Sequence, residues 1–290
     1  MRVALSIDQA GLREHIAERY GLQVETLNYL PVGEVSHNFV AQTTNGRRYI
    51  LKLLDQSRLA RTCVERLHHV LTMLRELREI SLPTAIPAPV FTIDRREMAT
   101  FGTYTVVVLN YVEGTNPDEQ TLHQPEIWGQ LARLVARLHS ATGKLRTAWP
   151  FVETYTLAFE AELLGGLRSL AQVGADACQG IRDLQALLVP RADEVILLLD
   201  RTKSLAAKAK EFASPQVLCH TDIHAMNLVI HQGALTLIDW EGLKLAPAEH
   251  DLFALTGEDF PAFLRSYWRA GGVRERSEER RVGKECATGC

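Results

Sequence analysis

Residues 218–241 read LCHTDIHAMNLVIHQGALTLIDWE, and the order of residue types in this stretch decides the fold. A His-x-Asp group ends a short apolar run, an asparagine follows its aspartate, and a second aspartate closes another apolar run. The β-like runs QVLCH, NLVIH and ALTLIDW interrupt a helical pattern. Strand ends present polar side chains on loops that the sheet braces. The stretch therefore predicts a polar site made of Asp222, Asn227 and Asp239.

These three residues offer the groups that magnesium-dependent phosphoryl transfer requires, a reaction that demands positioning and charge stabilisation more than covalent chemistry. One carboxylate receives the proton of the acceptor hydroxyl. A second carboxylate and an amide oxygen suit Mg²⁺, a hard cation that prefers oxygen ligands. A polar turn between strands would explain any one of these residues, but the joint pattern favours catalysis.

The segment HTDIHAMN, followed by LIDWE and APAEHDL, resembles the signature of the aminoglycoside phosphotransferase and choline kinase family. Within that family the chain looks closest to the spectinomycin phosphotransferase branch. The resemblance covers roughly residues 8–270. It implies an α+β, bilobal, protein-kinase-like fold with an antiparallel β N-lobe containing one helix and a mainly helical C-lobe. It also implies Asp222 as catalytic base, Asn227 and Asp239 as ligands of Mg²⁺, and ATP as the phosphoryl donor.

The resemblance implies structural roles for two further residues. His220 would pack under the metal loop, and Asp251 would brace the catalytic loop. His224 matches a family position to which we assign no role. The spacing of His220 and His224 would allow a metal site, but zinc usually requires further Cys or His ligands, and the five cysteines show no such spacing.

The N-terminal part of the chain reads as an antiparallel lobe of five strands with one inserted helix. The expected strands are 24–33, 37–44, 48–54, 90–93 and 103–111, and the expected helix is 58–80. Asn45-Gly46 supplies the turn between the second and third strands. A first helix precedes them, with Asp8 at its start and Gly21 at its end.

The same resemblance assigns the nucleotide side of the site. Lys52 matches the strand lysine that pairs with the α- and β-phosphates, and we expect the cleft between the two lobes to bring it near Asp239. Its partner would be a helix glutamate, for which Glu65 fits best because it opens the apolar periodicity, with Glu76 as the alternative.

The phosphate loop and the hinge complete this side. The loop PVGEVSHN has a single glycine, Gly33, and the resemblance implies that Ser36 and nearby backbone N–H groups face the phosphates. Adenine would contact backbone groups of the hinge, Asn110 and Val112 among them.

Val112–Asp118 reads as a linker, because Gly, Asn and Pro cluster there. We expect a nucleotide-binding N-lobe with hinge over residues 1–112 and a helical catalytic and acceptor-binding C-lobe over 113–275. Helical periodicity in the C-lobe marks 125–141, 156–172, 180–190, 192–212 and the segment PAFLRSYWRA. Residues 276–290 have no apolar periodicity and resemble a translated sequencing adapter. We expect these residues not to be native and the natural C-terminus to be missing from about residue 275, a natural charged tail being the alternative.

Composition narrows the class of partner. The net charge of −3 gives no reason to expect a nucleic-acid partner. No stretch approaches the ~18 apolar residues of a membrane span. The N-terminus is not a signal peptide, and the five scattered cysteines read as reduced thiols, so we expect a cytoplasmic protein. Acidic residues outnumber basic ones over 113–275, and Glu241 and Glu249 lie near the motif. This negative charge favours a cationic acceptor, although solvated helix faces explain the same excess.

The expected function is an ATP- and Mg²⁺-dependent phosphotransferase acting on a hydroxyl of a small molecule. An aminoglycoside or aminocyclitol antibiotic is the leading acceptor class, which would make the enzyme one of antibiotic resistance. Choline, homoserine or methylthioribose types are alternatives. A truncated, inactive binding protein of pseudokinase type is a further hypothesis, against which the intact residues Lys52, Asp222, Asn227 and Asp239 argue.

Overall fold

A computed structural model of the chain describes residues 7–31, 36–55, 58–82, 84–211 and 215–274, without the side chains of 58–62. The expectations for Gly33 and for residues 276–290 lie outside these residues. The chain forms two compact units: Met1–Val152 together with Pro215–Cys290, and Glu153–Ser214. The functional division at residues 112 and 275 stays a prediction.

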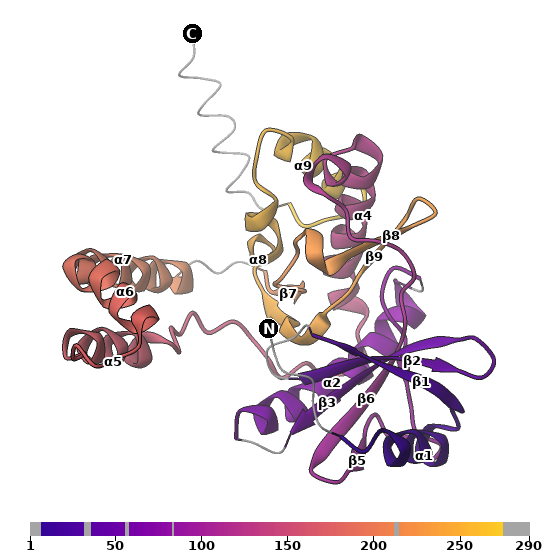
Figure 1. The fold of residues 1–290 in the computed structure, drawn as a ribbon. Helices are drawn as coiled ribbons and strands as arrows, with labels where there is room; N and C mark the ends of the chain where they lie inside the picture. Colours follow the sequence, from indigo (N-terminus) through magenta and orange to yellow (C-terminus); the bar gives the residue numbers. More distant parts are fainter. Residues whose placement is uncertain (1–6, 32–35, 56–57, 83, 212–214, 275–290) are drawn as a thin grey trace. The chain divides into compact units, whose positions relative to one another are not determined.

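The first unit contains the bilobal α+β arrangement that the sequence predicted (Figure 1). Its strands are β1 (Val24–Leu30), β2 (Ser36–Thr43), β3 (Arg48–Asp55), β4 (Pro89–Val90), β5 (Ala99–Phe101), β6 (Tyr104–Asn110), β7 (Val217–Cys219), β8 (Leu228–His231), β9 (Ala234–Leu237) and β10 (Lys244–Ala246). Its α-helices are α1 (Gln9–Tyr20), α2 (Arg58–Ile80), α3 (Glu119–Leu122), α4 (Pro125–Ala141), α8 (Glu249–Leu252) and α9 (Phe260–Arg269).

The N-terminal lobe is an antiparallel sheet with the strand order β1-β2-β3-β6-β4, in which β5 also pairs with β6. The hairpin between β2 and β3 turns at Asn45-Gly46 as predicted, and Gly46 has a φ of 80°, which glycine adopts without strain. The sequence predicted five strands, but the described sheet has six, because Ala99–Phe101 folds back onto β6. The strand expected at 90–93 ends at Val90, because Thr92 and Arg96 form a turn.

Helix α1 packs on one face of this sheet, beside β1 and β5 (Figure 1). The carboxylate of Asp8 caps its start by accepting the N–H groups of Ala10 and Gly11. Gly21, with a φ of 69°, ends it in the left-handed conformation, so both predicted ends are confirmed. The core on this face consists mainly of Leu12, Ile16, Phe39, Leu51, Leu53 and Val106.

Helix α2 connects the two lobes through their cores. Leu67 and Leu71 pack with Leu54 and Val107 on the opposite face of the sheet from α1. Val70, Met73, Leu74 and Leu77 of the same helix belong to the core of the C-terminal lobe. One continuous helix therefore fixes the sheet against the lobe that carries residues 218–241.

The core of the C-terminal lobe is built around α4, whose range matches the predicted helix at 125–141. Helix α9 packs along α4, and β7 pairs with β10 while β8 and β9 form a hairpin. The buried side chains include Leu131, Val135, Leu138, Leu218, Leu237, Phe263 and Tyr267. This core holds β7 and β9 in place, and Asp222 and Asp239 lie in the loops that follow these strands.

The segment expected as a linker is hydrogen-bonded to the β8–β9 hairpin. Thr115 exchanges two backbone hydrogen bonds with Ile230, at 3.1 and 2.9 Å. Gly114 has a φ of 127°, and a Cβ atom there would lie 2.3 Å from the carbonyl oxygen of Ile230. The side chain of Asn116 donates to the carbonyls of Met226 and Leu228, each at 2.8 Å. Residues 114–116 thus form a seam with the hairpin, which we call the hinge seam.

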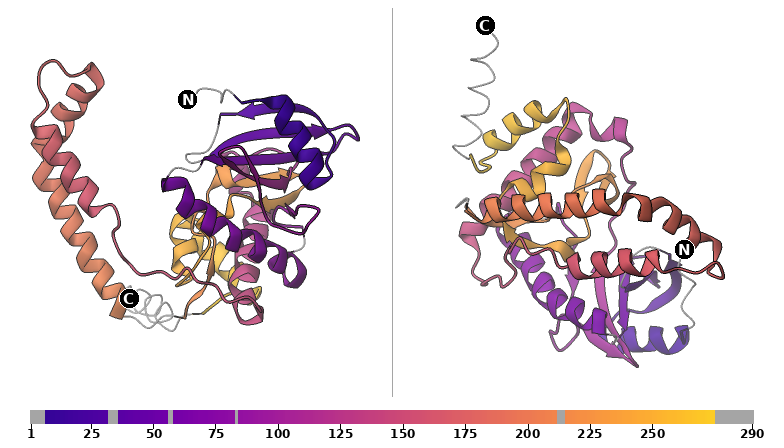
Figure 2. Two further views of the ribbon diagram at one scale, coloured as in Figure 1. Left: turned by 90° about the horizontal axis from the view of Figure 1, so that it is seen from below. Right: turned by 90° about the vertical axis from the view of Figure 1, so that its left-hand side faces the viewer.

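The second unit contains α5 (Glu160–Ala171), α6 (Gln179–Leu188) and α7 (Ala192–Glu211), shown from two sides in Figure 2. These helices confirm the three predicted over 156–212, with small shifts at their ends. Lys203 of α7 pairs with Glu160 of α5 at 2.6 Å. Among the described residues of Glu153–Ser214, only Leu167 and Leu199 are buried. The described part of the chain has no helix with the length and apolar character needed to cross a membrane.

Candidate active site

The loop between β7 and β8 brings Asp222 and Asn227 together. The loop turns sharply at Thr221, which has a φ of 72°, and a 3-10 turn over Ala225–Asn227 leads into β8. The Nδ2 of Asn227 donates to the backbone carbonyl of Asp222 at 2.9 Å and to its Oδ2 at 2.8 Å. The carboxylate of Asp222 is 56% exposed, so a substrate can reach it. His224 lies beside both residues, with its Nε2 3.4 Å from Asp222 Oδ1.

Asp239 lies next to this loop, because the residue before it is bonded to both ends of the loop. The N–H of Ile238 donates to the carbonyl of Asn227 at 2.8 Å, and the carbonyl of Ile238 accepts from Nε2 of His220 at 3.0 Å. Asp239 itself has a φ of 64°, a left-handed conformation that aspartate tolerates better than most residues. The backbone therefore brings Asp222, Asn227 and Asp239 into one cluster.

Lys52 approaches this cluster from the N-terminal lobe. Its Nζ lies 3.2 Å from Asp239 Oδ1 and also forms a close ion pair with Glu241. Burial alone would lower the pKa of Lys52, but the carboxylates of Glu241 and Asp239 outweigh it and hold the pKa above its ordinary value. The predicted approach of Lys52 to Asp239 is confirmed, and the lysine is charged.

The expected helix partner of Lys52 is wrong in this structure. Glu65 is exposed and makes no ion pair with any residue that the structure describes. Glu76 is buried at the other end of α2, where it accepts the backbone N–H of Thr147 at 3.2 Å. The partner of Lys52 is instead Glu241, because α2 turns Arg66 rather than Glu65 toward the loop after Asp239.

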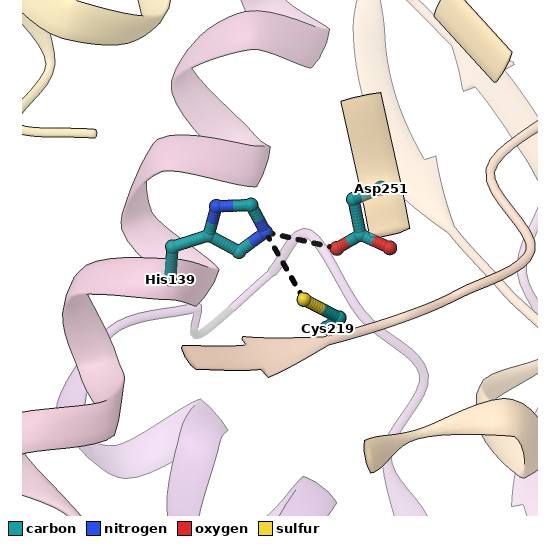
Figure 3. A group of neighbouring side chains, drawn as sticks. All are labelled: His139, Cys219 and Asp251. Atoms are coloured by element: carbon teal, nitrogen blue, oxygen red, sulfur yellow. Dashed lines mark hydrogen bonds and ion pairs between the residues drawn. The ribbon is translucent and has the colours of Figure 1, made fainter. Parts of the chain in front are cut away.

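A buried cluster under the catalytic loop holds it in place (Figure 3). The carboxylate of Asp251 accepts the backbone N–H groups of His220 at 3.0 Å and Thr221 at 2.6 Å, and also pairs with Nε2 of His139 at 3.0 Å. These hydrogen bonds outweigh the effect of burial and hold the pKa of Asp251 below its ordinary value. The bracing role implied by the family resemblance agrees with these contacts.

His139, Cys219 and Asp251 lie close enough together to share a cation, but their chemistry favours a structural role. Both oxygens of Asp251 already accept hydrogen bonds. Burial raises the pKa of the Cys219 thiol well above its ordinary value, and a metal ligand would have to be the thiolate. His220 packs edge-on against Trp240, and burial lowers its pKa, so the ring is neutral at pH 7.

The remaining predicted residues line the N-terminal lobe and the hinge. Ser36 lies on the same face of the sheet as Lys52, and its hydroxyl donates to Oδ1 of Asn38 at 3.0 Å. The N–H of Asn110 is bonded to the carbonyl of Ala88 at 2.8 Å, so it is used within the lobe. The N–H of Val112 has no hydrogen-bond acceptor among the described residues, which leaves it available to a ligand.

A family model described as "phosphotransferase enzyme family" matches residues 27–285 of this chain. The chain belongs to this family. Membership of this family makes the protein a phosphotransferase. A comparison with curated protein sequences gave no match.

Solved structures of other phosphotransferases share the fold. Spectinomycin phosphotransferase APH(9)-Ia, in complex with ADP and spectinomycin, has a TM-score of 0.69 at 19% identity, covering 93% of this chain and 82% of that one. The amicoumacin kinase hAmiN, with AMP-PNP, Ca²⁺ and Ami, has a TM-score of 0.66 at 16% identity, with coverages of 92% and 79%. A microcompartment-associated aminopropanol kinase has a TM-score of 0.61 at 19% identity, with coverages of 91% and 80%.

The residues of this phosphotransferase fit a hard divalent cation. Asp239 supplies carboxylate oxygens, and Asn227 uses its Nδ2 in hydrogen bonds to Asp222, so its Oδ1 is the atom available to a cation. Oxygen donors of this kind suit Mg²⁺.

Sequence reasoning missed two features of this phosphotransferase site. Glu241 was read only as a source of negative charge near the motif, although its place in IDWE put it beside Asp239. The contacts of Arg66 gave no signal in the sequence, because an arginine on a helix is usually a solvated surface residue.

Proposed function

We propose that this protein transfers the γ-phosphoryl group of ATP to a hydroxyl of an aminocyclitol-type small molecule in a Mg²⁺-dependent reaction. The observation that carries the proposal is the ion pair of Lys52 with Asp239 and Glu241, which joins the sheet lobe to the loop beside Asp222 and Asn227. A lysine and an acidic cluster from two lobes are the parts that nucleotide phosphates and their counter-ion need. The ADP, AMP and AMP-PNP complexes of the similar structures support a nucleotide as donor.

Each residue has a role set by its chemistry. Lys52 would bind the α- and β-phosphates, with backbone groups near Ser36 completing the cradle, while the N–H of Val112 would donate a hydrogen bond to the adenine ring. Asp239 and Asn227 would hold Mg²⁺, which when bound neutralises the charge on the transferred phosphoryl group.

Asp222 would act on the acceptor. Its carboxylate takes the proton of the acceptor hydroxyl as the acceptor oxygen forms a bond to the γ-phosphorus. The bond from that phosphorus to the bridging oxygen breaks, and ADP leaves. Asn227 donates to the backbone carbonyl and to Oδ2 of Asp222, and these bonds hold the carboxylate in the orientation that this proton transfer needs.

The proposed acceptor classes rest on the charge of the site and on two solved structures that share the fold. The carboxylates of Asp222 and Asp239 are half-exposed, which favours a cationic acceptor. Spectinomycin, the compound bound to APH(9)-Ia, is the first candidate for this reason. A small amino alcohol is the second candidate, since the aminopropanol kinase shares the fold and such an acceptor also combines an ammonium group with a hydroxyl.

Release of ADP from Mg·ATP tests the proposal against a panel of acceptors. The panel contains spectinomycin, other aminoglycosides, choline and small amino alcohols, each assayed with and without Mg²⁺. We expect ADP release that needs both Mg²⁺ and one acceptor class. Tight binding of Mg·ATP without turnover on any acceptor would favour the pseudokinase hypothesis, and absence of nucleotide binding would refute the proposal.

A further inference from the structure

Arg66 connects helix α2 to the loop that follows Asp239. Its Nε donates to the carbonyl of Glu241 at 2.6 Å, and its Nη2 donates to the carbonyls of Gly242 at 2.8 Å and Leu243 at 2.7 Å. One guanidinium therefore binds three successive carbonyls. The planar fork of an arginine can do this, whereas a lysine ammonium has no matching geometry.

The surroundings of Arg66 differ from those of a solvated surface arginine. Its guanidinium stacks over the ring of Phe151, 4.6 Å from the ring centre. Burial lowers the pKa of Arg66, yet an arginine stays protonated in proteins. Its positive charge faces carbonyl oxygens, which are the negative ends of backbone dipoles. Arg66 therefore occupies a specific binding site, in which the backbone carbonyls of the loop stabilise its positive charge.

The same loop is held from its other side by the catalytic loop. The hydroxyl of Thr221 donates to the carbonyl of Gly242 at 3.0 Å, so this one oxygen accepts from both Thr221 and Arg66. A Cβ atom at residue 242 would lie 2.6 Å from Oγ1 of Thr221, so only glycine allows this approach. The carbonyl of Gly242 is thus the point where α2, the catalytic loop and the loop after Asp239 meet.

The side chains on this loop face Lys52. Asp239 and Glu241 both pair with its ammonium group, while the backbone of Glu241 is bound by Arg66. We infer that Arg66 is a positioning residue, which sets Asp239 and Glu241 opposite Lys52 so that the site can bind Mg·nucleotide. Arg66 acts on Lys52 indirectly, by binding the backbone of the loop that carries its partners. The sequence had led us to expect a helix glutamate that pairs with Lys52 directly. The inference rests on the proposed function, because it assigns Arg66 a part in nucleotide binding.

Two variants of Arg66 and one control test this role. Arg66→Gln removes the charge and most of the donors, and Arg66→Lys keeps the charge without the fork. Arg75→Gln is the control, because Arg75 lies on the same helix and also stacks on an aromatic ring, that of Phe91 at 5.0 Å. The readouts are hydrogen exchange of the amides of residues 239–246 without ligand, the Kd for Mg·ADP, and the KM for the acceptor.

We expect faster exchange in 239–246 for both Arg66 variants, and Mg·ADP binding that is weaker by roughly 10–100-fold for Arg66→Gln and by less for Arg66→Lys. The KM for the acceptor should stay close to that of the wild type, and Arg75→Gln should change none of the three. A merely stabilising arginine would lower the melting temperature without this selective loss of nucleotide affinity. If the Arg66 variants showed unchanged exchange in the loop, or faster exchange with unchanged Mg·ADP affinity, the role of Arg66 would be refuted and the proposed function would stand. A wild-type protein that binds no Mg·ADP would overturn both the proposed function and the role of Arg66.

Discussion

Asp222 combines exposure with a fixed orientation, which is what a general base requires. Its carboxylate is 56% exposed, yet the amide of Asn227 holds one of its oxygens at 2.8 Å. The other carboxylates of the cluster, Asp239 and Glu241, are both engaged by Lys52. Asp222 is therefore the carboxylate of the cluster that remains outside the Lys52 ion pair and can serve the acceptor.

We expect Asp222→Asn to lower turnover by roughly 10²–10⁴-fold, the usual contribution of a general base. The fold and the Kd for Mg·ADP should stay near wild-type values, because an asparagine keeps the shape and can still accept from Asn227. Steady-state kinetics and calorimetric titration measure the two quantities separately. If the variant kept most of its activity, the base would have to be another group.

Glu76 is a buried carboxylate that stabilises the protein at a distance from the candidate active site. It is 5% exposed and accepts the backbone N–H groups of Arg146 and Thr147. Burial alone would raise its pKa, but these hydrogen bonds outweigh it and hold the pKa below the ordinary 4.5. Its stabilising effect is therefore complete above the unfolded-state pKa and is lost as the pH falls through the lower folded-state value.

We expect Glu76→Gln to lower the free energy of unfolding by about 1–3 kcal/mol at pH 7, because two N–H groups lose a charged acceptor. The difference from the wild type should shrink below a pH of about 4.5. Glu79→Gln is the matched control, since Glu79 is 54% exposed and also pairs with Arg146. Urea denaturation at several pH values measures both, and a loss that persists undiminished at acid pH would contradict this account.

Among the secondary-structure elements, the hinge seam departs most from its sequence pattern. Gly, Asn and Pro over 112–118 favour a free linker, but residues 114–116 bond to β8 on both backbone and side chain. The carbonyls that Asn116 binds belong to the residues on either side of Asn227. The seam therefore supports the metal-loop asparagine from behind.

We expect Gly114→Ala to destabilise the protein by about 1–3 kcal/mol from backbone strain alone, and its Cβ would also clash with the carbonyl of Ile230. Gly143→Ala serves as control, because a Cβ atom there would meet nothing within 4 Å. The midpoint of urea unfolding should fall for the first variant and stay nearly unchanged for the second. Equal midpoints would show that the seam can open at little cost.

Local patterns predicted the elements well, whereas contacts between elements escaped prediction. The caps Asp8 and Gly21 and the Asn45-Gly46 turn are encoded by residues close in sequence, so they could be read directly. The pairing of Lys52 with Glu241 joins residues far apart in the chain, and the choice of Glu65 failed because a sequence does not give the rotation of a helix about its axis. The approach of Lys52 to Asp239 was predictable only through the family resemblance.

At the scale of the whole molecule, the two compact units differ greatly in their cores. The first unit contains a large buried cluster around α4, shared with α2. The second has two buried residues among those the structure describes, Leu167 and Leu199, and exposed leucines such as Leu197 at 70%. Because little apolar surface is buried within the second unit, its own packing contributes little to its stability.

We expect amide hydrogens of α5, α6 and α7 to exchange at least about tenfold faster than those of α4, since local opening costs less free energy where the core is thin. Leu199→Ala should speed exchange in these three helices and leave α4 unchanged, because Leu199 is 5% exposed. Leu198→Ala is the control, at 62% exposed. Protection in α5–α7 equal to that in α4 would mean that these helices bury their apolar faces on another surface.

The rate at which the buried thiol of Cys219 is alkylated can report how often the C-terminal lobe opens. Its side chain is fully covered beneath the catalytic loop, and burial raises the pKa of the thiol, so the reactive thiolate is scarce in the folded lobe. Alkylating reagents can modify this sulfur only during the moments when β7 separates from its neighbours. Cys178, which is exposed, reacts on the time scale of the reagent itself and provides the reference. The ratio of the alkylation rates of Cys219 and Cys178 reports how often the lobe opens, and no engineered probe residue is needed.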